Sequence, residues 1–137
     1  MKNIALVLIL LTITSIHAQD ETITTEKMTE TISINDNKLL RHVVLFQFKK
    51  GTTAEKIKEI ESAFHNLPSK IKEISSYEWG LNNSPENLNK GFTHCFFLTF
   101  KNEEDRAKYL PHPDHKAFGE LLTPHLEDVL VLDYWTN

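Results

Sequence analysis

Runs of β-branched and aromatic residues, separated by stretches with helical spacing of apolar residues, recur along the chain from about residue 39 to its end. Residues Arg41–Phe48 are mostly β-branched or aromatic, which is typical of a strand. Because side chains alternate along a strand, one face carries His42, Val44, Phe46 and Phe48, and the other carries Val43, Leu45 and Gln47. Three further stretches are predicted as strands: Ile74–Leu81, Phe92–Phe100 and Val129–Trp135. The same rule groups Tyr77 with Trp79 and Leu81, His94 with Phe96, Leu98 and Phe100, and Val131 with Asp133 and Trp135.

Helical spacing of apolar residues follows the first strand. The apolar residues are Ile57, Ile60, Phe64 and Leu67, and Pro68 ends the pattern. Thr52, with Glu55 three residues later, forms a capping box at the start of this helix. We expect the charged side chains between the apolar positions to face water: Lys56, Lys58, Glu59 and Glu61.

A second helical region lies between the third and fourth predicted strands. Asn102 is predicted to cap a helix over Glu103–Tyr109. Another helix begins near Pro113 and ends at Pro124, and it carries the apolar residues Ala117, Phe118, Leu121 and Leu122. Earlier in the chain, Ser84 could cap a short helical turn that has Pro85 at its first position.

The predicted order β-α-β-β-α-β is that of a ferredoxin-like α+β protomer, a split βαβ unit. Its sheet carries helices on one face only, yet both faces of the predicted strands are largely apolar. An uncovered apolar face of that size is unusual on a monomer. We therefore expect two copies to pack sheet against sheet as a C2 homodimer.

The first 38 residues have a different character. Lys2, an apolar run from Ile4 to Ile13 and the small residue Ala18 form the pattern of a signal peptide over residues 1–18. The run is shorter than the ~20 apolar residues that span a bilayer, and the alternative is an N-terminal helix or anchor. Residues 19–38 read as an acidic, Thr-rich flexible linker, or else as an edge strand or swapped arm. We expect residues 39–137 to be a secreted or periplasmic domain that has no membrane contact after cleavage.

Composition narrows the range of functions. The chain has 137 residues, 15 Lys and Arg and 19 Asp and Glu, for a net charge of −4. That length fits one compact domain, and the mildly acidic balance argues against a nucleic-acid partner. The single cysteine, Cys95, excludes an intrachain disulfide and a cysteine-based zinc site. Its position among aromatic residues predicts that it is buried in the core.

Several short motifs together resemble one family. They are His42, Tyr77–Gly80, Gly91–His94, Tyr109–His115 and Val129–Tyr134. In this combination and spacing they resemble the stress-responsive α/β-barrel domain family, the dimeric α/β barrels often called Dabb. The resemblance extends over about residues 40–135. It implies a ferredoxin-like protomer and a dimeric barrel, as the hydrophobic pattern does.

The resemblance also implies candidate catalytic residues. A plant member of the family closes a linear polyketide thioester by aldol condensation, and its base, its tyrosine and its first-strand histidine match His115, Tyr109 and His42. His115 would be the third residue of its helix, where the helix dipole disfavours the imidazolium, although Asp114 acts in the opposite direction. A neutral His115 could accept a proton next to a carbonyl, and Tyr109 could donate to the developing oxyanion. His42, expected on the barrel-facing side of its strand, could orient a substrate or a water.

The candidate ligand-binding residues form a wider set: His42, Phe46, Trp79, His94, Tyr109, His112 and His115. We expect no cofactor and no metal, although His112 and His115, joined by His42 or His94, could hold a transition metal ion. Alternatively, His112 and His115 only secure the connection between two helices, and Tyr109 packs over the mouth of the barrel. Trp79 is then an aromatic residue of the core or the dimer interface, and His94 a hydrogen-bonded histidine of the barrel. Three functions remain open at this point. The protein binds a small apolar or carbonyl ligand, is a small cyclase, isomerase or lyase, or is a structural dimer.

Overall fold

The computed structural model describes residues 38–137, so the predicted signal peptide and residues 19–37 of the predicted linker lie outside the described residues. Within that range the elements are β1 (Leu40–Phe48), α1 (Ala54–His65), α2 (Leu67–Lys70), β2 (Ser76–Leu81), β3 (His94–Phe100), α3 (Glu103–Tyr109), α4 (Pro113–Leu122), η2 (Thr123–His125) and β4 (Leu126–Trp135). No helix in this part of the chain is long and apolar enough to cross a membrane.

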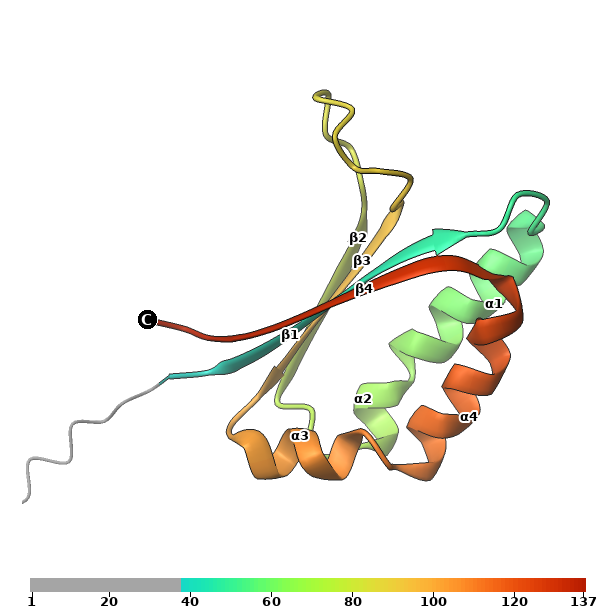
Figure 1. The fold of residues 1–137 in the computed structure, drawn as a ribbon. Coiled ribbons are helices and arrows are strands. Elements are labelled where there is room, and N and C mark those ends of the chain that lie inside the picture. Colours follow the sequence, from blue (N-terminus) through green and yellow to red (C-terminus); the bar gives the residue numbers. More distant parts are fainter. Residues whose placement is uncertain (1–37) are drawn as a thin grey trace, which may run out of the picture. The chain divides into compact units, whose positions relative to one another are not determined.

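The strands form one antiparallel sheet in the order β2-β3-β1-β4, and the helices lie on one side of it (Figure 1). This arrangement confirms the predicted ferredoxin-like α+β fold. The register pairs His42 of β1 with Leu98 of β3 and with Asp133 of β4. Because side chains alternate, the predicted division of each strand into two faces follows directly from this register.

The core lies between the sheet and the helices, and aromatic rings fill its centre. Phe64 of α1 stacks on Phe96 of β3 with their ring centroids 4.1 Å apart. Phe118 of α4 meets the same Phe64 ring edge-on at 4.9 Å, and Phe46 of β1 lies 4.9 Å from Phe96. These contacts hold α1 and α4 against β1 and β3, since offset and edge-to-face pairs add to the free energy of apolar burial.

Some local predictions were wrong by a residue or more. The cap of α1 is Thr53 and not Thr52, because Thr53 has extended backbone and its hydroxyl accepts a hydrogen bond from the Lys56 amide. Pro68 does not end a helix but lies in the first turn of the short α2, where its missing N–H costs no hydrogen bond. No helical turn forms at Ser84, whose hydroxyl accepts a bond from the Glu86 amide within a turn.

The second face of the sheet, here called the open face, carries no helix. Its apolar side chains are Val43, Leu45, Cys95, Phe97, Leu130, Leu132 and Tyr134. Leu132 is 52% exposed and Tyr134 48% exposed. A single chain therefore leaves one of the two apolar faces of the sheet uncovered. The prediction that Cys95 is a core residue was wrong, because it is only half-buried on this face. Partial burial, with a contribution from Glu78, raises the pKa of its thiol.

The aromatic centre predicts how stability responds to truncation. Phe64→Ala should lower the free energy of unfolding by about 3–5 kcal/mol, because it leaves a cavity between four aromatic neighbours. Leu88→Ala, at a residue that is 74% exposed, should change it by less than about 0.5 kcal/mol. Urea unfolding of both variants at one protein concentration measures the difference, and equal midpoints would contradict this description of the core.

Candidate functional site

A cavity of about 290 Å³ lies between the β1–β4 edge of the sheet and helices α3 and α4. Its polar lining residues are His42, Tyr109, His115 and Asp133. The remaining side chains of its wall are almost all apolar: Val44, Phe46, Phe64, Leu110, Phe118, Leu122, Leu126, Val129 and Val131. The cavity therefore combines a few converging polar groups with an apolar wall, as small-molecule sites commonly do.

His42 is fixed by a carboxylate on the neighbouring strand. Its Nδ1 lies 2.8 Å from Oδ1 of Asp133, and an ionised carboxylate can only accept, so Nδ1–H donates. The second carboxylate oxygen, Oδ2 of Asp133, lies 3.3 Å from Nη1 of Arg106 in α3. The chain Arg106–Asp133–His42 thus joins α3, β4 and β1, and it sets the orientation of the imidazole.

Tyr109 and His115 lie side by side at the junction of α3 and α4. Their ring centroids are 4.3 Å apart, and the His42 ring meets Tyr109 edge-on at 5.7 Å. Nδ1 of His115 lies 2.9 Å from the carbonyl oxygen of Leu110. A carbonyl accepts only, so Nδ1 carries the proton and Nε2 of a neutral His115 holds the free lone pair.

Burial shifts the pKa values of His115 and Tyr109 in opposite directions, and both side chains stay neutral. Burial lowers the pKa of His115 below 6.5, and the nearby His42 and His112 rings lower it further, while the Leu110 carbonyl acts in the opposite direction. His115 is therefore neutral at physiological pH. Burial raises the pKa of Tyr109, whose side chain is 1% exposed, so its hydroxyl keeps its proton. A neutral base and a neutral donor stand next to each other, which suits proton transfer beside a carbonyl.

The structure brings four of the predicted site residues into one cavity, namely His42, Phe46, Tyr109 and His115. His112 does not line it. Instead, Nδ1 of His112 accepts a hydrogen bond from the Asp114 amide at 3.2 Å and caps α4. His112 thus secures the connection between α3 and α4, which was one of the two roles expected for it. His115 also bonds to this connection, through the Leu110 carbonyl, but in addition lines the cavity.

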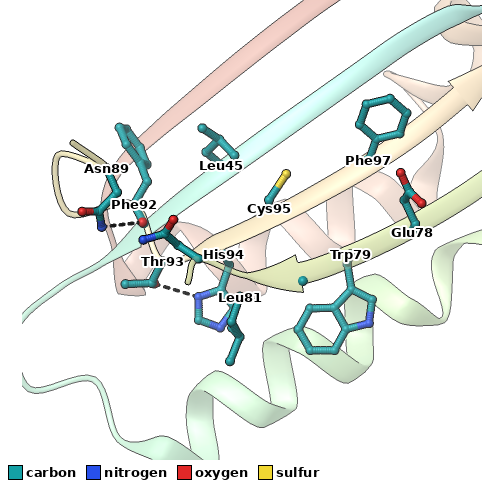
Figure 2. Close-up of a pocket in the computed structure, with 12 residues that line it drawn as sticks. Leu45, Glu78, Trp79, Leu81, Asn89, Phe92, Thr93, His94, Cys95 and Phe97 are labelled. Carbon is teal, nitrogen blue, oxygen red and sulfur yellow. Dashed lines mark hydrogen bonds between the residues drawn. The ribbon is translucent and has the colours of Figure 1, made fainter. Parts of the chain in front are cut away.

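Trp79 and His94 belong to a different hollow of about 460 Å³ at the end of the β2–β3 hairpin (Figure 2). His94 is 7% exposed, and both of its ring nitrogens are bonded, one to Thr93 Oγ1 at 2.8 Å and one to Glu61 Oε1 at 2.9 Å. It is therefore a satisfied structural histidine. Its partner Glu61 was expected to face water, but its side chain is only 19% exposed because it covers His94.

Two features of the site differ from the sequence-based expectation. His42 does not face the barrel side of the sheet, because it shares a face with Val44 and Phe46 and contacts Tyr109 under the helices. Asp133 and Arg106 were not predicted as site residues at all. One indication of Asp133 was present in the sequence: its carboxylate shares a face of the predicted strand with the apolar residues Val129, Val131 and Trp135.

The histidines that could have formed a metal site have other partners in residues 38–137. Within them, no group of three or more His, Cys, Asp or Glu side chains is placed to hold a metal ion. His112 and His115 are used in helix capping and carbonyl bonding instead.

Comparison with known proteins identifies the family. The pattern of the family described as the Stress responsive A/B Barrel Domain matches residues 40–136. The chain belongs to this family. It is similar to the stress-response A/B barrel domain-containing protein HS1 of Arabidopsis thaliana, with 40% identity over 95 residues, 69% of this chain and 87% of HS1. The family predicted from the motifs is thereby confirmed.

Two further relatives are named for an enzymatic activity, and a third is described as dimeric. Olivetolic acid cyclase of Cannabis sativa is 28% identical over 95 residues, 69% of this chain and 94% of the cyclase. The structure of a hydroxynitrile lyase from Passiflora edulis gives a TM-score of 0.70 at 27% identity, covering 74% of this chain and 95% of the lyase. A dimeric protein with a ferredoxin-like fold from Bacteroides fragilis gives a TM-score of 0.59 at 28% identity, covering 72% of this chain and 96% of that protein.

The lowered pKa of His115 predicts a pH dependence of stability. The unfolded chain binds this proton near pH 6.5 and the folded chain only at lower pH. The contribution of His115 is therefore complete above about pH 6.5 and is lost as the pH falls through the interval down to its folded pKa. The imidazole NMR signal that disappears in His115→Gln should titrate with a midpoint below pH 6.5 in the wild type. As the pH is lowered from 6.5 to that midpoint, the variant should lose less free energy of unfolding than the wild type does. A midpoint at or above 6.5 would contradict the buried setting.

Proposed function

We propose that the protein binds a small, uncharged carbonyl compound in the cavity between the sheet and α4. The observation that carries this proposal is the convergence of His42, Tyr109 and His115 on a space whose wall is otherwise apolar. A cavity of about 290 Å³ accommodates roughly ten non-hydrogen atoms, if each takes the ~30 Å³ of a water molecule. The ligand is therefore smaller than a typical drug.

The β1–β4 register gives the ligand a direction. The polar pair His42 and Asp133 lies at one end, and the pairs Val44 with Val131 and Phe46 with Val129 follow toward the other. A carbonyl oxygen at the polar end can accept a hydrogen bond from the Tyr109 hydroxyl. The hydrocarbon part of the ligand then lies against Phe46 and its neighbours. The largely apolar wall disfavours a charged ligand.

A second candidate function is proton-transfer catalysis on such a ligand, and the free Nε2 of a neutral His115 favours it. For a cyanohydrin, Nε2 takes the hydroxyl proton, the carbon–carbon bond to the nitrile breaks, and a carbonyl forms. The departing cyanide takes the proton from His115, which restores the neutral imidazole. The names of two relatives, a cyclase and a hydroxynitrile lyase, are consistent with carbonyl chemistry in this fold.

We further propose that the protein is a homodimer in which two open faces pack together. Support comes from the exposed apolar residues of that face and from dimeric relatives of the same fold. Export to the periplasm or the outside of the cell is also a proposal. It rests on the signal-peptide pattern of residues 1–18, with Lys2 before an apolar run and Ala18 at the cleavage point.

Benzaldehyde is a suitable first probe, since it has a carbonyl, an aromatic ring and a size that fits the cavity. We expect it to shift the methyl NMR signals of Val44, Val129 and Val131 in a saturable way. Release of benzaldehyde from mandelonitrile, followed by absorbance, tests catalysis. His115→Gln should reduce that rate on the order of 100-fold, while His65→Gln, at an exposed residue outside the cavity, should not change it.

Each outcome of this experiment bears on one candidate. Saturable shifts without turnover support binding and remove the lyase reaction. Turnover that survives in His115→Gln excludes His115 as the base. If the methyl signals of the cavity do not respond to benzaldehyde, the binding site lies elsewhere and the main proposal is wrong.

Export predicts a shortened chain outside the cytoplasm. Expression of the full-length gene in a host that processes signal peptides should yield a protein whose mass corresponds to residues 19–137. Intact-mass spectrometry of the exported fraction measures this. Ala18→Arg should block cleavage, because the position before the cleavage point requires a small residue. A full-length protein confined to the cytoplasm would contradict the proposal.

A further inference from the structure

The open face carries few charges, and two of them flank the same ring. In the described part of the chain its charged side chains are Arg41, Glu78 and Asp128. The Arg41 guanidinium lies over the Phe97 ring, 5.2 Å from its centroid, and donates a hydrogen bond to Thr99 Oγ1. Glu78 stands opposite Phe97 in the β2–β3 register. Figure 2 shows Glu78 and Phe97 on the side of the sheet that also carries Leu45 and Cys95.

Within the described part of one protomer, neither of these two charges has an oppositely charged partner. Among residues 38–137, no ion pair of 4.0 Å or less involves Arg41 or Glu78. Solvent screens them in a single chain. Once a second sheet covers this face, however, an unpaired buried charge is strongly destabilising, and truncating one partner of a buried pair costs several kcal/mol. The dimer therefore requires a counter-charge for each group.

Two-fold symmetry can supply both counter-charges at once. The register aligns Arg41 with Thr99 and Ser76, and it aligns Val43 with Phe97 and Glu78. The line from Arg41 to Glu78 therefore crosses β3 between Phe97 and Thr99. A two-fold axis that lies in the interface and is the perpendicular bisector of this line places Arg41 over Glu78 of the partner subunit, and the reverse contact follows by symmetry.

We propose that two symmetric ion pairs, each between Arg41 and the partner subunit's Glu78, set the register of the two sheets in the homodimer. This inference rests on the proposed homodimer and adds the position of its two-fold axis under β3. Apolar contacts of the open face supply most of the association energy, and they tolerate several relative positions. The two ion pairs select one of them, since a shifted or rotated arrangement would leave Arg41 and Glu78 buried without a partner.

Asp128 is the competing carboxylate, and its surroundings make it the weaker partner. It lies at the start of β4 beside an irregularity of the β1–β4 register. Its Oδ1 already accepts the Val129 amide at 2.8 Å. It is paired with Gln47, six residues from Arg41 along β1, or about 20 Å at the rise of a strand. Pairing with Asp128 would move the axis toward the opposite end of the sheet.

Charge reversal tests the proposal in the full chain. Sedimentation equilibrium gives the dimer dissociation constant of the wild type, Arg41→Glu, Glu78→Arg and the double variant. Each single variant should raise this constant on the order of 100-fold, because both symmetric pairs become repulsive. The double variant exchanges the charges and should return to within about tenfold of the wild type. The pair Arg41→Glu with Asp128→Arg is the matched control and should show no such return.

The outcomes separate this inference from the proposed homodimer. A monomeric wild type refutes the dimer and with it the ion pairs. A wild-type dimer whose constant is unchanged in both single variants refutes only the ion pairs, as does rescue by Asp128→Arg in place of Glu78→Arg. Circular dichroism checks that each variant is folded. If a reversal prevents folding, the neutral variants Arg41→Gln and Glu78→Gln serve instead. Each should weaken the dimer, and an unchanged constant in both overturns the inference.

Discussion

The antiparallel register between β1 and β4 is the constraint on which the site depends. It places Asp133 directly beside His42, where their side chains bond at 2.8 Å, and it places valines beside Val44 and Phe46. A slip of one residue would turn Asp133 to the open face and present Leu132 to His42. The cavity would then lose the group that orients its first-strand histidine. The polar and apolar ends of the cavity thus follow from one pairing of strands.

The two histidines of the site are held by different partners, and the difference matters for their chemistry. His42 donates to an ionised carboxylate, which in turn is bonded to Arg106. His115 donates to a neutral backbone carbonyl and is partly buried, and burial lowers its pKa. The second imidazole can accept a proton at neutral pH, because burial keeps it unprotonated and its Nε2 is free. Tyr109, packed between the two rings, supplies the donor.

The sequence predicted local features well because they depend on short-range geometry. Alternation along each strand placed His42 with Phe46 and Asp133 with Val131, and Asn102 was correctly predicted to cap α3. The pairing of Asp133 with His42 was missed because it joins residues 91 positions apart. The burial of Glu61 was missed for the same reason, since its partner His94 lies 33 positions away.

The alternation of β1 also keeps ligand binding and association apart within one strand. Its residues 42, 44 and 46 line the cavity, whereas residues 41, 43 and 45 belong to the open face. The two surfaces are thus separated by the thickness of a single sheet. A contact that shifts β1 on the open face must also shift His42 relative to Tyr109, because the same backbone carries both. Packing of a second copy on the open face would therefore restrict the motion of the site's first-strand wall, even though its side chains do not enter the cavity.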